Sequence, residues 1–188
     1  YTEWGLERVK VEGGELCWLN NWVPYEWSVR ELDFADTLHL ALAYYQSGRG
    51  RDGYKLLMGV VHESAFKSFS PGTINIAPHF PSRGLEPFRQ GRATDFADGV
   101  SLFGRVALEG VFGLRPNYPQ GIVTCAPQFP DDWDRASLET PEFKLEFRSV
   151  SGESTYHLHL TRAARVRWVL PLLCERILEV TLNGQPVP

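Results

Sequence analysis

Residues 95–133 read DFADGVSLFGRVALEGVFGLRPNYPQGIVTCAPQFPDDW, and the pattern of the chain changes within them. Apolar side chains recur at helical spacing as far as Phe112, and Gly113 followed by Pro116 is a typical helix end. A turn, a short apolar run and a Pro-rich link ending in Asp-Asp-Trp follow. Because helical patterns precede this stretch and strand patterns follow it, the sequence predicts an α+β fold with segregated elements.

The predicted helices cover about 95–112 and, upstream, 30–46 and 53–66. The helix over 30–46 is apolar on most of its surface, which is typical of a buried helix. The helix over 53–66 has an apolar stripe on one side. A Gly-rich turn over 47–53 joins these two, so the sequence predicts an αα-hairpin.

Other upstream segments have no regular period. Residues 1–12 fit either the end of a helix or a short amphipathic strand, and Gly13-Gly14 marks a break. Residues 15–29 hold three Trp and one Tyr and predict an aromatic-rich loop. Residues 67–93 carry four Pro and predict a long loop, of a length usually associated with function or disorder.

The region after the link predicts an antiparallel β-sandwich-like module. PEFKLEFRSV (141–150) and STYHLHLTRA (154–163) alternate apolar and polar side chains at period two, with a hairpin turn between them. Two later runs extend the predicted meander, and Asn183-Gly184 is a typical two-residue hairpin turn. We therefore divide the chain into a helical region, 1–116, and a β module, 117–188.

Composition excludes several classes of function. The 188 residues carry a net charge of −4, which argues against a nucleic-acid-binding protein. No apolar run reaches the roughly 20 residues of a membrane helix, so a soluble protein is expected; its compartment stays open, with secretion or a periplasmic location among the alternatives. The widely spaced Cys17, Cys125 and Cys174 predict buried thiols rather than a zinc site. His157 and His159 share one strand face and fit an exposed polar surface better than a metal site, so no metal and no cofactor are expected.

The order of these parts resembles the C-terminal region of six-hairpin (α/α-toroid) glycosidases. In that superfamily a last toroid helix ends in an Arg-Pro turn and leads into a β-sandwich through a Pro-rich link ending in Trp. Arg115-Pro116 and the link residues Pro127, Phe129, Pro130 and Trp133 match this pattern. A toroid of six hairpins needs many more helices than are predicted here, so the resemblance implies a fragment or partial domain.

The resemblance implies the C-terminal part of a glycoside hydrolase, whose helical portion helps to form a sugar-binding mouth. Its partners would be a carbohydrate substrate and either an upstream helical portion of the same protein or a second copy. The alternative is a non-catalytic carbohydrate-binding or structural module that keeps the toroid tail without its chemistry.

Glycoside hydrolysis needs two carboxyl groups that flank the scissile bond, and the two long loops supply the candidates. Glu26 lies between Tyr25 and Trp27, near Trp22, and aromatic side chains of this kind stack on sugar faces. Glu86 is the catalytic candidate of the second loop. Other charged side chains of the loops and helix starts are weaker candidates for catalysis or substrate binding, because helix capping, first-turn charge or an ordinary solvated loop surface also explains them. They are Glu31, Asp33, Asp36, Asp95, Asp98, Arg83, Arg89 and Arg92.

Overall fold

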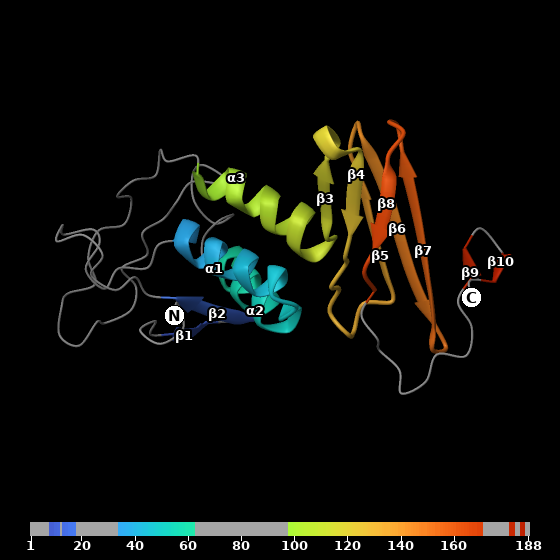
Figure 1. Cartoon of the computed structure of the whole chain (residues 1–188). Helices are drawn as coiled ribbons and strands as arrows, with labels where there is room; N and C mark the ends of the chain where they lie inside the picture. The colour runs from blue at the N-terminus through green and yellow to red at the C-terminus, as the bar shows by residue number, and fades with distance from the viewer. Residues whose placement is uncertain are drawn as a thin grey trace, which may run out of the picture.

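The structure, a computed structural model, describes residues 8–11, 13–17, 34–62, 98–170, 181–182 and 185–186. Within these residues the chain forms a mixed α+β fold, with a layer of helices beside a group of strands (Figure 1). A small hairpin lies against the helices on the side away from α3 (Figure 1). None of the described helices combines the length and apolar character needed to cross a membrane.

The helices lie close to their predicted positions. Helix α1 spans Phe34–Gln46, α2 spans Gly50–Val60, and α3 spans Asp98–Arg105 and continues as a π-helical segment, Val106–Val111. The predicted buried character of α1 is confirmed, because nine of its side chains are buried. Helix α2 starts three residues before the predicted position, since the backbone NH groups of Asp52 and Gly53 already bond to the carbonyl of Arg49.

Residues near the N-terminus form a hairpin that the sequence predicted only in part. Strand β1, Arg8–Val11, pairs antiparallel with β2, Gly14–Cys17, around a turn in which Gly13 has φ 74°. The strand alternative for residues 1–12 is therefore right for the described part. The loop predicted from residue 15 is wrong for 15–17, because the hairpin ladder continues through them.

Tyr45 fixes how the helices pack. Its ring is buried, and a Cβ atom on either Gly53 or Gly110 would lie 2.7–2.8 Å from it. Tyr45 is at the end of α1, Gly53 is near the start of α2, and Gly110 is near the end of the π-helical segment. Helices α1 and α3 therefore run in the same direction, with α2 antiparallel to both (Figure 1).

The strands that follow the last helix form two three-stranded sheets and a short terminal pair, and from here on the β module includes β3. The sheet orders are β3-β4-β8 and β5-β6-β7, and β9 pairs with β10. Their bounds are β3 Leu114–Asn117, β4 Ile122–Cys125, β5 Arg135–Glu139, β6 Phe143–Val150, β7 Glu153–Leu160, β8 Arg165–Trp168, β9 Thr181–Leu182 and β10 Gln185–Pro186.

One pairing corrects the predicted antiparallel meander. Strand β8 does not continue beside β7 but pairs in parallel with β4, in the other sheet. The backbone NH of Arg165 bonds to the carbonyl of Gly121, and the NH of Val169 bonds to the carbonyl of Cys125. Strand β5 was not predicted. Residues from both three-stranded sheets share one buried cluster: Leu114, Val123, Cys125, Phe143 and Leu145.

The predicted hairpin of β6 and β7 is confirmed. Phe143, Leu145 and Phe147 are buried, while the side chains between them are exposed. Val150 pairs with Glu153 across a turn whose two residues, Ser151 and Gly152, have φ values of 52° and 85°. Positive φ at both positions is the geometry of the turns that suit a twisted hairpin.

The stretch that changes pattern also joins the two halves. The helix ends at Gly113, with φ 65°, and β3 begins at the next residue, across the predicted boundary at 116/117. The following link lies against the helix end, since the NH of Ala126 bonds to the carbonyl of Gly113 and the NH of Gln128 bonds to that of Val111. The Gln128 side chain donates to the carbonyl of Tyr45 at 2.6 Å.

Candidate functional site

The predicted site residues belong to the segments 18–33 and 63–97, which lie outside the described residues. These residues are the catalytic candidates Glu26 and Glu86 and the predicted sugar-binding residues Trp22, Tyr25 and Trp27. Their relative placement stays a prediction. The described residues do fix where each segment leaves and rejoins the fold.

Both segments attach at the same end of the helix layer. Segment 18–33 runs from the end of β2 to the start of α1, and segment 63–97 runs from beyond α2 to the start of α3. Because α1 and α3 run in the same direction and α2 runs against them, the starts of α1 and α3 lie at the end where α2 finishes (Figure 1). The opposite end of the layer faces the β module.

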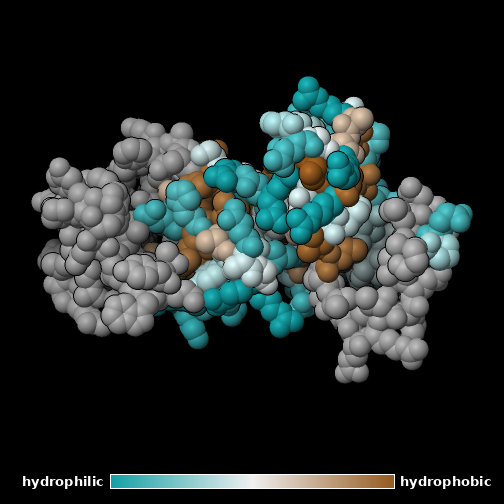
Figure 2. Space-filling model, in the orientation of Figure 1, coloured by the Kyte–Doolittle hydropathy of each residue, from teal (hydrophilic) through white to brown (hydrophobic). Residues whose placement is uncertain are grey.

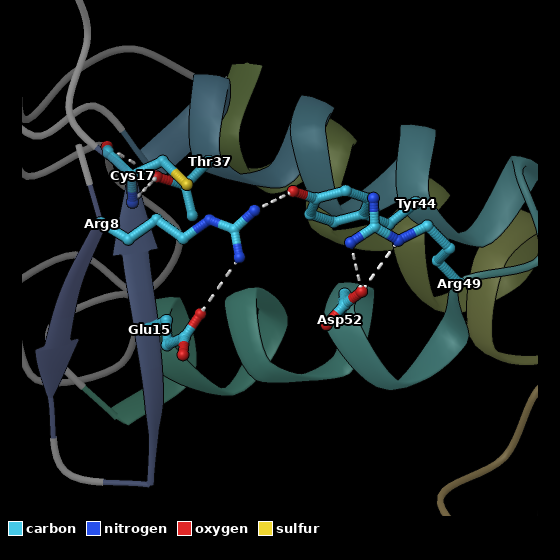
Figure 3. A network of polar contacts seen from close by, with 7 residues as sticks. All are labelled: Arg8, Glu15, Cys17, Thr37, Tyr44, Arg49 and Asp52. Atoms are coloured by element: carbon cyan, nitrogen blue, oxygen red, sulfur yellow. Dashed lines mark hydrogen bonds and ion pairs between the residues drawn. The ribbon is translucent and has the colours of Figure 1, made fainter. Parts of the chain in front are cut away.

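Thr37 ties together the two ends of segment 18–33. Its side chain is fully buried, and its hydroxyl accepts from the NH of Cys17 and donates to the carbonyl of Cys17, both at 3.3 Å. Cys17 is the last residue of β2, and Thr37 lies in the first turn of α1 (Figure 3). The segment that carries Glu26 therefore begins and ends at one point of the fold.

A polar network holds the hairpin on the helices (Figure 3). Arg8 donates to the Tyr44 hydroxyl and has its Nη1 3.8 Å from Glu15 Oε2. The Arg49 guanidinium lies 4.5 Å from the centre of the Tyr44 ring and donates to Asp52 at 2.6 and 2.9 Å. The Tyr44 ring therefore lies beside two guanidinium groups, one from β1 and one from the turn before α2.

This network is a poor candidate for acid–base catalysis. Both of its carboxylates, Glu15 and Asp52, lie beside an arginine, whereas glycoside hydrolysis needs two carboxyl groups that are available to flank the scissile bond. No local sequence pattern indicates this network, because its members are spread over β1, β2, α1, the turn before α2, and α2. Asp36, a minor candidate, lies in the first turn of α1, 3.7 Å from His39.

The described cysteines are confirmed as buried free thiols. Burial raises the pKa of Cys17 to about 11, although Arg8 opposes this shift, and burial raises the pKa of Cys125 to about 12. Thiols with such raised pKa values are poor nucleophiles. Cys174 lies outside the described residues.

The part of the chain that the structure describes holds no group of three or more His, Cys, Asp or Glu side chains placed to bind a metal ion. His157 and His159 are exposed on β7, opposite Glu146 and Lys144 of β6.

Comparisons of the chain with protein-family models, with curated proteins and with solved structures found no match. Functional inference therefore depends on the residues and their arrangement.

Proposed function

We propose that this chain is the C-terminal part of a carbohydrate-active glycoside hydrolase of the six-hairpin kind. In this proposal, segments 18–33 and 63–97 form part of a sugar-binding mouth, and the β module supports the helices from the other end. The observation that carries the proposal is the attachment of both candidate-bearing segments at one end of the helix layer. Catalytic pairs in such enzymes need carboxyl groups that reach a common mouth.

The proposed chemistry assigns one carboxyl of the Glu26 and Glu86 pair as general acid and the other as base or nucleophile. Trp22, Tyr25 and Trp27 would present apolar faces to the sugar ring. The hydrogen bonds between Thr37 and Cys17 support this arrangement, because they bring together the two points of the fold between which four of these five residues lie in the chain.

The proposal includes an assignment of both halves of the fold, the helices to an α/α toroid and the sheets to a β-sandwich. The α1–α2 hairpin followed by α3 would be one part of an α/α toroid, which further helices from the same protein or a second copy would complete. The two β-module sheets would form a sandwich, and their shared buried cluster supports that assignment.

The alternative function is a non-catalytic carbohydrate-binding or structural module. It is favoured by the described carboxylates, since the partly buried Glu15, Asp52 and Glu109 each lie beside an arginine. In that case the chain would bind sugar through Trp22, Tyr25 and Trp27 alone, without catalytic carboxyl groups.

The two functions are separated by hydrolysis and binding assays of the chain, alone and joined to its natural upstream sequence, on a panel of glycosides. We expect hydrolysis that Glu26→Gln and Glu86→Gln each reduce by about a hundredfold or more, with binding retained. Glu153→Gln, at the exposed start of β7, is the matched control. Binding without hydrolysis would support the alternative. If the unaltered chain neither bound nor hydrolysed any glycoside of the panel, even when joined to its upstream sequence, the proposal would be refuted.

A further inference from the structure

The outer face of the β3-β4-β8 sheet carries arginines in register. Arg115 of β3 pairs with Thr124 of β4, and Thr124 pairs with Arg167 of β8. Val123 and Cys125 flank Thr124 and are fully buried, so the row through Thr124 lies on the opposite side of the sheet from the core. The next row on this face joins Asn117, Ile122 and Arg165, so the face is mostly polar, whereas the other face is apolar.

Arg165 belongs to the same face, two residues before Arg167, and both arginines are exposed. We name Arg115, Arg165 and Arg167 the arginine face. Figure 2 shows hydrophilic residues together with hydrophobic ones in the part of the β module where Figure 1 places β3, β4 and β8.

The charges of the arginine face are not neutralised within the described part of the chain. None of the three arginines forms an ion pair there, and the buried Nε of Arg115 has no hydrogen-bond partner. In the helical half, by contrast, arginines pair with nearby carboxylates: Arg8, Arg49, Arg51 and Arg105. A concentration of unpaired cations in a chain of net charge −4 indicates an external anion.

The geometry suits an extended anion with repeated charges. Arg165 and Arg167 are separated by about 7 Å along β8, and Arg115 lies about 10 Å from Arg167 across two strand spacings. Guanidinium groups bind carboxylates through paired hydrogen bonds, and Thr124 adds a hydroxyl between two of them. A single small anion would contact only one or two of these groups.

We propose that the arginine face binds an acidic polysaccharide through carboxylates on successive sugars. The choice of a saccharide rests on the proposed function; the requirement for a polyanion rests on the unpaired arginines. The site lies on the β module, so it would hold a substrate chain away from the mouth, at a second point of contact.

The test measures binding of the whole chain to polygalacturonate, with its fully methyl-esterified form as the uncharged ligand. We expect binding to the charged polymer that weakens with salt, and little binding to the ester. Arg165→Gln combined with Arg167→Gln should weaken binding by about tenfold or more, since each arginine loses charge-assisted hydrogen bonds. Arg115→Gln should weaken it further.

The matched control removes the same charge from the other sheet. Arg135→Gln combined with Arg148→Gln changes two exposed arginines that lie opposite each other on the neighbouring strands β5 and β6. Circular dichroism checks that all variants fold. Equal losses in the control would show nonspecific attraction and refute the site. The site would also be refuted if the chain did not bind polygalacturonate, or if it bound the ester equally well. It would likewise be refuted if the chain formed a dimer that dissociates in the Arg165→Gln, Arg167→Gln variant.

Failure of this inference is distinguishable from failure of the proposed function. Hydrolysis that depends on Glu26 or Glu86 but not on the arginines would refute the inference alone. Arginine-dependent binding of polygalacturonate without hydrolysis would support the inference and favour the non-catalytic alternative.

Discussion

At the scale of single residues, Gly14 and Gly59 allow the hairpin and α2 to touch backbone to backbone. A Cβ atom on Gly14 would lie 2.2 Å from the amide nitrogen of Gly59, and one on Gly59 would lie 2.0 Å from the carbonyl oxygen of Glu15. Backbone atoms cannot move aside as the end of a flexible side chain can. The absence of two side chains therefore determines where the hairpin lies.

We expect Gly59→Ala to destabilise the chain by about 3 kcal/mol, because the added methyl would overlap the backbone of Glu15 in β2. The matched control is Gly104→Ala in α3, where an added Cβ meets nothing within 4 Å. There the better helix propensity of Ala should stabilise the chain by about 1 kcal/mol. Urea unfolding measures both, and a stabilised Gly59→Ala variant would contradict the described packing.

At the scale of elements, the end of the last helix and the link that follows it form one unit. Gly113 ends the helix in the left-handed region, and the link returns so closely that a Cβ on Gly113 would lie 2.0 Å from the carbonyl oxygen of Ala126. The predicted Arg115-Pro116 break is therefore not a turn but the middle of strand β3. The direction change takes place at Gly113 itself.

Gly113→Ala and Gly121→Ala form a matched pair, since both glycines have φ 65° and only Gly113 has atoms within 4 Å of an added Cβ. Each variant should lose about 1 kcal/mol from backbone strain. Gly113→Ala should lose about 2 kcal/mol more from the contact with Ala126. If urea unfolding gave equal decreases in the free energy of unfolding for the two variants, the close contact between the link and the helix end would be contradicted.

At the scale of the whole molecule, a continuous series of aromatic rings joins the helical half to the β module. Phe129 of the link lies 5.2 Å from Phe112, 6.0 Å from Trp133 and 4.7 Å from Phe147, measured between ring centres. Trp133 contacts Tyr54 of α2, at 5.9 Å. The series continues across the sheets to Tyr156 and Trp168. The two halves are therefore expected to unfold together.

We expect Phe129→Ala to cost about 2–4 kcal/mol and to separate the unfolding of the two halves. Tryptophan fluorescence and far-UV circular dichroism should give coincident transitions for the unaltered chain and divergent ones for the variant. Val150→Ala, at a side chain that is 68% exposed, should change stability by no more than about 0.5 kcal/mol. Coincident transitions in Phe129→Ala would contradict the coupling.

The sequence by itself determined the elements whose side chains repeat at a regular period. The buried face of α1 and the alternation of β6 and β7 could be read from it, because burying apolar side chains is favourable and burying a charged one is costly. The sequence also supplied Glu26 and Glu86 as catalytic candidates, and their relative placement stays a prediction.

Only the tertiary structure decided the contacts between residues far apart in the chain. The parallel pairing of β8 with β4, the contact of Gly14 with Gly59, and the alignment of Arg115 with Arg167 depend on which segments lie side by side. Local periodicity carries no information about such pairings, since the same alternating strand fits either sheet. For that reason residues 95–133 predicted a change from helices to strands, and the fold alone showed that Gly113 and Phe129 hold the two halves together.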